Sequence, residues 1–310
     1  MRIATIDLGS NTVRLLVADV MAGIARWRVV ESDQRVTRLG EGLASTGRLG
    51  EAPAERTAAA VSEYVARARR AAADRVAIVA TSAVREAANG REFAAALERA
   101  TGERVTIVSG DEEAALTLAG VLGGLADGGA DAGATLVFDI GGGSTEYILA
   151  RDRKPVAATS LRLGVVDLAE RYPFPGSVEW PRYRAMLTEI SARLTSELPA
   201  EIRSTRFRRL VGTAGTATTL AALDLGLLAY DAARVQGHVL TRGAIESQLA
   251  RLGALTVAER GALPCLEPGR ADLIVAGTAI VQATLDLTGA GAMVVSDWGL
   301  REGILVKLRG

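Results

Sequence analysis

The chain opens with two apolar runs that flank a polar turn. Residues 2–8 and 13–20 are apolar and rich in β-branched side chains, and Gly9-Ser10-Asn11 separates them. Apolar runs bounded by turn residues predict a β-hairpin. Residues 135–140 and 147–150 form a second pair around a turn of three glycines, a serine and a threonine. The pattern therefore predicts two hairpins.

The two predicted hairpins resemble each other at a constant spacing. A shift of 132 residues places Asp7 on Asp139, Gly9 on Gly141 and Val17 on Leu149. This weak internal repeat indicates two related domains, because solenoid repeats have far shorter periods.

Helical and strand patterns alternate along the rest of the chain. Helices are predicted at 51–73, 90–100, 112–122, 165–171, 178–198, 216–225, 241–252 and 269–287, and strands at 75–80, 104–108 and 292–295. Alternation of this kind predicts an α/β fold. The glycine-rich stretch 126–133 is the best boundary, giving domains at 1–124 and 125–310. The amphipathic end, 298–310, is able to pack back on the first domain.

Composition supports a globular protein of about two domains. The chain has 310 residues, 49% hydrophobic and 23% charged, and a domain averages roughly 150 residues. With 36 Lys+Arg against 36 Asp+Glu, a polycationic surface for nucleic acid is not expected. Asp7, Asn11 and Arg14 interrupt the apolar N-terminus, which argues against a signal peptide or membrane span. We expect a cytoplasmic protein with no membrane or nucleic-acid partner.

Residue usage narrows the chemistry further. The chain has one cysteine, Cys265, and one histidine, His238, so an intramolecular disulfide, thiolate metal clusters and paired-histidine centres are excluded. Its two lysines are Lys154 and Lys307, neither of which follows a glycine, so no Walker A loop exists. Catalysis is therefore expected to rest mainly on carboxylates.

Both hairpin turns follow an aspartate, and their backbone N–H groups could hold one anion from two directions. An ordinary hairpin is the alternative for the first turn. Three successive glycines, Gly141–Gly143, weaken a strand end unless a ligand approaches the backbone closely. Asp7, Asp139 and Glu146 add hard oxygen ligands suited to Mg²⁺ beside phosphate. The alternative is that the aspartates accept hydrogen bonds from their own turns.

Three further segments carry candidate chemistry. Residues 109–114 open a helix, where a carboxylate is either a general base or a group that stabilises the helix start. Arg85 follows a predicted strand and offers a guanidinium fork to phosphate, or is a surface arginine. The small-residue turn at 210–216 could approach a phosphate chain. Arg67 and its neighbours are predicted as a solvated helix face.

Five segments together resemble the exopolyphosphatase and guanosine pentaphosphate phosphatase (Ppx/GppA) family. They are residues 6–12, 81–85, 109–114, 138–146 and 295–303. The resemblance spans nearly the whole chain. It implies the actin-like ATPase fold shared by actin, sugar kinases and heat-shock chaperones, with two ribonuclease H-like domains and an interdomain cleft. The expected cleft would have Asp7 and Asp139 facing each other.

The resemblance also implies roles for individual residues. Glu113 would be the general base, and Asp139 and Glu146 would bind Mg²⁺, with Mn²⁺ as an alternative. The implied phosphate contacts are Ser10, Asn11, Arg85, Gly142, Gly143 and Ser144. A homodimer is implied as well. Long family members carry an additional C-terminal helical domain, and this chain resembles the short two-domain form, so short polyphosphate chains are the expected substrates.

The expected activity is release of terminal orthophosphate from inorganic polyphosphate by metal-assisted, in-line attack of water. Guanosine pentaphosphate is the alternative substrate, because it presents a similar terminal anhydride. Two rivals remain open. One is an ATP-dependent kinase of the same superfamily, and the other is a non-enzymatic sensor of polyphosphate or a guanosine alarmone.

Overall fold

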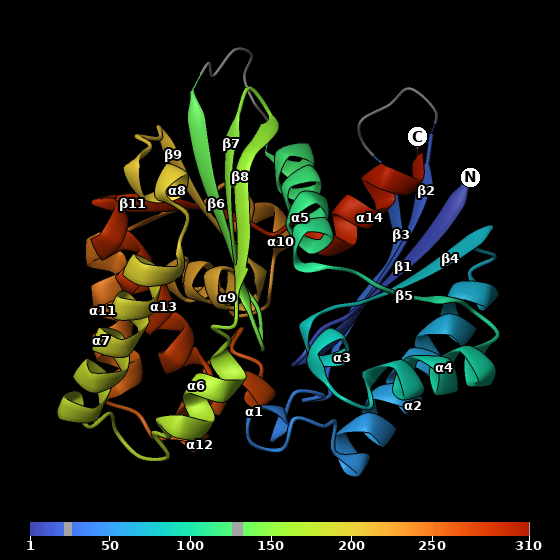
Figure 1. Cartoon of the computed structure of the whole chain (residues 1–310), viewed down its shortest axis with the longest axis horizontal. Helices are drawn as coiled ribbons and strands as arrows, with labels where there is room; N and C mark the ends of the chain where they lie inside the picture. The colour runs from blue at the N-terminus through green and yellow to red at the C-terminus, as the bar shows by residue number, and fades with distance from the viewer. Residues whose placement is uncertain (22–26, 126–132, 310) are drawn as a thin grey trace. The chain divides into compact units, whose positions relative to one another are not determined.

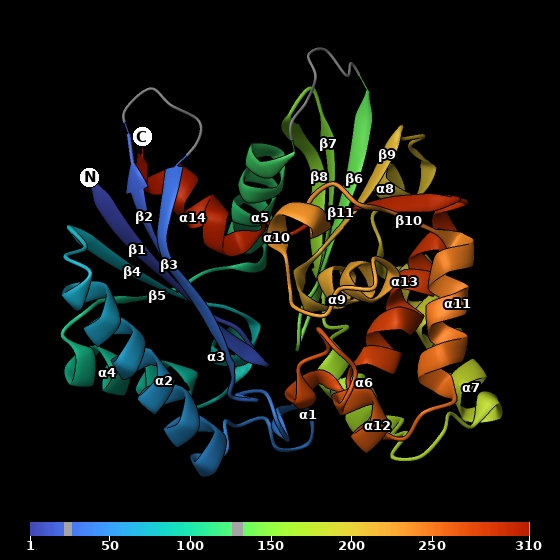
Figure 2. The same cartoon turned by 180° about the vertical axis from the view of Figure 1, so that it is seen from behind.

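A computed structural model describes residues 1–21, 27–125 and 133–309. The chain divides into two compact units (Figures 1 and 2). The first comprises Met1–Gly123 with Gly299–Gly310, and the second comprises Gly124–Trp298. Most of the glycine-rich stretch predicted as a boundary lies outside the described residues. Among the helices that are described, none combines the length and apolar character needed to cross a membrane.

The first unit is a mixed five-stranded sheet in the order β3-β2-β1-β4-β5. Its strands are β1 (Arg2–Leu8), β2 (Thr12–Val20), β3 (Trp27–Val36), β4 (Arg75–Ala80) and β5 (Val105–Ile107). Its helices are α1 (Leu43–Thr46), α2 (Glu51–Arg70), α3 (Ser82–Glu86), α4 (Gly90–Thr101), α5 (Gly110–Gly124) and α14 (Leu300–Arg309). Strands β1, β2 and β3 run antiparallel, whereas β1, β4 and β5 run parallel.

Alternate residues of β1 face two different layers of this unit. Ile6 and Leu8 belong to a buried core with Tyr64 of α2, while Ile3 packs in a separate cluster with Leu305 of α14. This alternation is the pattern expected of a strand buried on both faces. The C-terminal helix therefore covers the sheet face opposite α2 (Figure 1).

The second unit is a six-stranded sheet in the order β10-β11-β9-β6-β7-β8. Its strands are β6 (Ala134–Ile140), β7 (Thr145–Arg151), β8 (Lys154–Leu161), β9 (Arg209–Thr213), β10 (Val239–Thr241) and β11 (Ala292–Ser296). Its α-helices are α6 (Val165–Arg171), α7 (Trp180–Glu197), α8 (Ala200–Ser204), α9 (Ala214–Asp224), α10 (Ala232–Val235), α11 (Arg242–Gly253), α12 (Val257–Gly261) and α13 (Ile274–Thr288). One large apolar core joins the sheet to these helices.

The two sheets repeat one arrangement, with β10 as an additional edge strand in the second. In both hairpins the aspartate near the end of the first strand pairs with the residue seven positions later, Asp7 with Arg14 and Asp139 with Glu146. The glycine after each first strand donates its N–H to a carbonyl three residues on, at 3.1 Å and 2.9 Å. Both predicted hairpins and the α/β class are confirmed, and the shared strand order is the expected ribonuclease H-like one.

Several elements differ from the sequence-based expectation, including short ones such as β10, α1, α8, α10 and α12, which were not predicted. The third antiparallel strands, β3 and β8, were not predicted, because most of their residues are exposed or half-buried and their apolar positions are sparse. The helix expected at 269–287 begins only at Ile274, after a separate 3₁₀ turn at Pro268–Arg270.

Arg260 is fully buried in the second unit, and no carboxylate of the described residues accepts a hydrogen bond from it. Its guanidinium donates to three backbone carbonyls, those of Leu252 at 2.8 Å, Phe174 at 3.0 Å and Gly176 at 3.2 Å. Burial lowers the pKa of this group. The side chain therefore ties the end of α11 to the segment that precedes α7.

We expect Arg260→Met to destabilise the protein by about 3 kcal/mol, because it leaves buried carbonyl oxygens without their donors. Urea unfolding followed by circular dichroism measures this change. Arg234→Met is the control, since Arg234 is exposed and its side chain makes no hydrogen bond within the described residues. Equal stability of the two variants would contradict the structural role of Arg260.

Candidate active site

The first turn, at the end of β1, is held by a segment that sequence analysis missed. Ser10 accepts a hydrogen bond on its carbonyl from Gly40 N at 2.7 Å. The carbonyl of Asn11 accepts two, from Thr37 N at 2.9 Å and Arg38 N at 3.0 Å. The turn is therefore fixed by residues 37–40, which follow β3, and no local motif indicates this pairing.

Two polar atoms beside this turn have no hydrogen-bond partner among the described residues. They are Oδ1 of Asn11, a residue 8% exposed, and Oγ1 of Thr37, a residue 1% exposed. A buried polar atom without a partner costs about 1–3 kcal/mol. A bound polar group or a water molecule at this place would remove that cost. Asp7 and Ser10, which are near Asn11 in the sequence, are buried as well.

Arg85 and Glu113 come together in the first unit although they lie on different helices. Arg85 is on α3, directly after β4, and Glu113 is in the first turn of α5. Nη1 of Arg85 donates to Oε2 of Glu113 at 2.7 Å and to the carbonyl of Val108 at 3.0 Å. The Glu113 side chain is only 10% exposed. The arginine thus holds a buried carboxylate in one orientation.

The two neighbouring glutamates of α5 have different environments. Glu112 is exposed and accepts a hydrogen bond from Ser109 N at 2.9 Å, while Ser109 Oγ accepts one from Glu112 N at 3.2 Å. These bonds form a capping box, and they lower the pKa of Glu112. The helix start is therefore capped by Glu112, and Glu113 is available for another role.

In the second unit, Asp139 and Glu146 are register partners on β6 and β7, so both side chains extend from the same face of the sheet. Asp139 is half-buried and Glu146 is 1% exposed. Oε1 of Glu146 accepts hydrogen bonds from Ser144 Oγ at 2.7 Å and Ser160 Oγ at 2.6 Å. Because a hydroxyl has one hydrogen, the Ser144 donor is directed to Glu146 here.

The glycine turn between these strands is backed by the start of α6. The carbonyls of Gly141 and Gly142 accept hydrogen bonds from Val165 N at 3.2 Å and Val166 N at 2.9 Å. A Cβ at Gly164 would lie 2.2 Å from the Gly142 carbonyl oxygen. Glycine is thus required for this close packing, which fixes the turn and leaves Gly142 partly exposed.

Further polar residues occupy the same register across the sheet. Thr213, at the end of β9, pairs with Asp139, and Ser296 of β11 pairs with Thr213. Both are buried, and both hydroxyls donate to the carbonyl of Trp298, at 3.1 Å and 2.8 Å. The predicted third turn therefore lies in the same polar row as the two carboxylates.

The donor set of Asp139 and Glu146 fits a hard divalent cation. Magnesium is commonly held by one or two carboxylates, with water and substrate phosphate completing its shell. Within the described ranges no group of three or more histidine, cysteine, aspartate or glutamate side chains is arranged to hold a metal. A cation at this place would thus depend on two carboxylates and on substrate oxygens.

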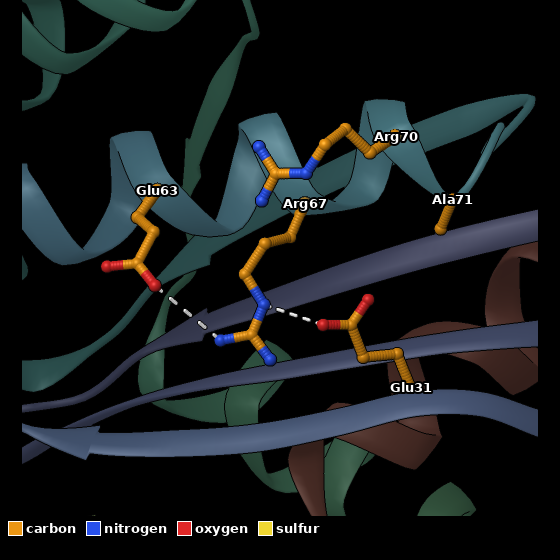
Figure 3. A pocket seen from close by; sticks show the side chains of 5 residues that line it. All are labelled: Glu31, Glu63, Arg67, Arg70 and Ala71. Atoms are coloured by element: carbon orange, nitrogen blue, oxygen red, sulfur yellow. Dashed lines mark hydrogen bonds and ion pairs between the residues drawn. The ribbon is translucent and has the colours of Figure 1, made fainter.

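A hollow of about 440 Å³ on the first unit differs chemically from the turns described above (Figure 3). It is lined by Glu31, Glu63, Arg67, Arg70 and Ala71. Arg67 pairs there with Glu31 at 2.6 Å and Glu63 at 3.7 Å, and also with Asp33. The Arg67 side chain is 20% exposed, whereas Arg69 and Arg70, which were predicted on the same solvated face, are exposed. Because carboxylates surround Arg67, the hollow is poorly suited to phosphate.

Comparisons with known proteins agree with this architecture. The model of the Ppx/GppA phosphatase family matches residues 16–309. The chain therefore belongs to the Ppx/GppA family. Membership identifies a phosphoanhydride hydrolase, and the family points to a divalent metal cation as cofactor.

Individual relatives match over nearly their full length. Exopolyphosphatase 2 of Mycobacterium tuberculosis is 35% identical, and the match covers 100% of this chain and 99% of that protein. The crystal structure of the Aquifex aeolicus Ppx/GppA family member has a TM-score of 0.82 at 33% identity, covering 99% and 97% of the two chains. That of an exopolyphosphatase from Cytophaga hutchinsonii has a TM-score of 0.91 at 25% identity, covering 100% and 98%.

Proposed function

We propose that this protein is an exopolyphosphatase that releases terminal orthophosphate from inorganic polyphosphate. The observation that carries this proposal is the pairing of Asp139 and Glu146 beside a glycine turn, in a chain of a phosphatase family whose relatives include named exopolyphosphatases. Guanosine pentaphosphate is the less favoured substrate. Two of the relatives described above carry a substrate in their names, and in both it is polyphosphate.

In this proposal Glu113 is the general base that takes a proton from the attacking water. Its buried ion pair with Arg85 holds the carboxylate in one orientation. Arg85 Nε and Nη2 donate no hydrogen bond to the described residues, so this arginine can also donate to a phosphate oxygen. The base and one phosphate contact would then be positioned by the same guanidinium.

The remaining proposed substrate contacts come from the two turns. Ser10 and Asn11 would bind phosphate from the first unit, and Gly142 and Gly143 from the second, through N–H groups directed at anionic oxygens. We propose that Ser144 contributes mainly by holding Glu146, because its hydroxyl hydrogen is directed there.

Asp139 and Glu146 are the proposed ligands of Mg²⁺, with Mn²⁺ as an alternative. A bound divalent cation would neutralise charge on the phosphate oxygens as the anhydride breaks. The protein residues position the substrate and the attacking water. Because water attacks the phosphorus directly, no covalent nucleophile is required. The acceptor of the phosphoryl group is water, which distinguishes this activity from that of a kinase.

A phosphate-release panel tests the proposed function. Short polyphosphate, long polyphosphate, guanosine pentaphosphate and ATP are incubated with the protein, with and without Mg²⁺. We expect Mg²⁺-dependent orthophosphate release from polyphosphate with the highest kcat/KM of the panel. A higher kcat/KM for guanosine pentaphosphate would make that compound the preferred substrate instead of polyphosphate. Binding of polyphosphate without release of orthophosphate would favour a non-enzymatic sensor.

The double variant Asp139→Asn with Glu146→Gln is expected to lower Mg²⁺-dependent turnover at least about 100-fold, since it removes both anionic ligands. Asp152→Asn with Glu179→Gln is the matched control, because it changes two exposed carboxylates of the same unit. Steady-state phosphate release at varied Mg²⁺ measures the effect. Turnover equal to that of the control would rule out these two ligands.

A further inference from the structure

Ser160 is a half-buried residue on β8 that sequence analysis did not single out. It is the register partner of Glu146 on the neighbouring strand. Its Oγ donates to Glu146 Oε1 at 2.6 Å, and Ser144 Oγ donates to the same oxygen at 2.7 Å. One carboxylate oxygen is thus held by two hydroxyls, one from the turn and one from the adjacent strand.

This arrangement has a clear chemical consequence. Two donors on Oε1 restrict rotation of the Glu146 side chain. The donor on β8 is placed by strand pairing, independently of the glycine turn. Hydrogen bonds from outer residues to a ligating carboxylate commonly set the orientation in which it meets a metal.

We propose that Ser160 is a positioning residue that orients Glu146 toward a divalent cation. The proposal rests on the role that the proposed function gives to Glu146. Ser160 itself need not touch the substrate or the cation. A purely structural role predicts instead that loss of this hydroxyl alters stability and leaves cation affinity unchanged.

Binding of Mn²⁺ alone to the full-length protein, measured by isothermal titration calorimetry, tests the proposal without relying on activity. Ser160→Ala removes the donor, whereas Ser160→Thr keeps a hydroxyl on a strand. Thr159→Val is the matched control, because Thr159 is the adjacent half-buried residue and its side chain extends to the opposite face. Thermal unfolding of each variant is measured in parallel.

We expect Ser160→Ala to raise the Kd for Mn²⁺ about tenfold, at the lower end of the range for lost outer-sphere partners, since Ser144 still holds Glu146. Ser160→Thr and Thr159→Val are expected to bind as the wild type does. Should Ser160→Ala fail to fold, Ser160→Cys keeps the volume with a much weaker donor and is also expected to bind Mn²⁺ more weakly.

Unchanged Mn²⁺ affinity in Ser160→Ala, or an equal loss in Thr159→Val, would overturn the proposal. Absence of Mn²⁺ binding by the wild type would overturn it as well. The proposed function is tested separately by phosphate release from polyphosphate. A wild type that binds Mn²⁺ but releases no phosphate contradicts the function, and the titration still decides the role of Ser160.

Discussion

Replacing Glu113 with glutamine is expected to lower kcat for orthophosphate release by about 10²–10⁴-fold, the usual contribution of a general base. Glutamine keeps the size of the side chain and can still accept the hydrogen bond from Arg85. The melting temperature should therefore change little. Steady-state kinetics at saturating polyphosphate and Mg²⁺, together with thermal unfolding, separate the two effects.

Glu112→Gln is the matched control on the same helix. Glu112 is exposed and belongs to the capping box with Ser109, so its loss of charge should cost about 0.3–1 kcal/mol of stability and leave kcat nearly unchanged. If Glu113→Gln keeps kcat within tenfold of the wild type, Glu113 is not the base. A similar loss of kcat in both variants would point to disruption of the helix start.

Gly303→Ala is expected to destabilise the first unit by at least about 3 kcal/mol, at the upper end of the range for overpacking. A Cβ at this position would lie 1.8 Å from the Leu116 carbonyl oxygen, so α14 and α5 could not keep their close approach. Leu116 lies on α5 one turn after Glu113. We therefore expect both stability and turnover to fall.

Gly243→Ala provides the control for this prediction. Gly243 is an exposed helical residue, and a Cβ there would meet no atom within 4 Å. Alanine at such a site is expected to be neutral or to stabilise the helix by up to about 1 kcal/mol. Thermal unfolding of both variants gives the comparison, and a Gly303→Ala protein as stable as Gly243→Ala would contradict the close helix packing.

The local part of the fold was predictable from the sequence. The hairpin around residues 9–11 and the one around 141–144 combine apolar strands with glycine-rich turns, and both are found as predicted. These elements depend on nearest neighbours in the chain, so a short window of sequence contains the necessary pattern. The same holds for α2, whose apolar spacing matches its buried face.

Pairings between distant segments were not predictable in this way. The contact of Thr37 with the turn at Asn11 depends on strand β3, and the contact of Ser160 with Glu146 depends on strand β8. Both strands have weak apolar patterns. The different environments of Glu112 and Glu113 could be assigned only once the position of Arg85, on another helix, was known. The sequence motifs therefore located the candidate site, and the side-chain contacts in the structure distinguished the roles of neighbouring residues within it.

Hydrolysis of polyphosphate in H₂¹⁸O, followed by mass spectrometry of the products at early turnover, tests the central claim most directly. Attack of water on the terminal phosphorus places one solvent-derived ¹⁸O in each released orthophosphate, and this is the result we predict. Orthophosphate without the label would show that water attacks a different phosphorus atom. Transfer of the phosphoryl group to another acceptor, with no orthophosphate formed, would contradict the assignment as a hydrolase.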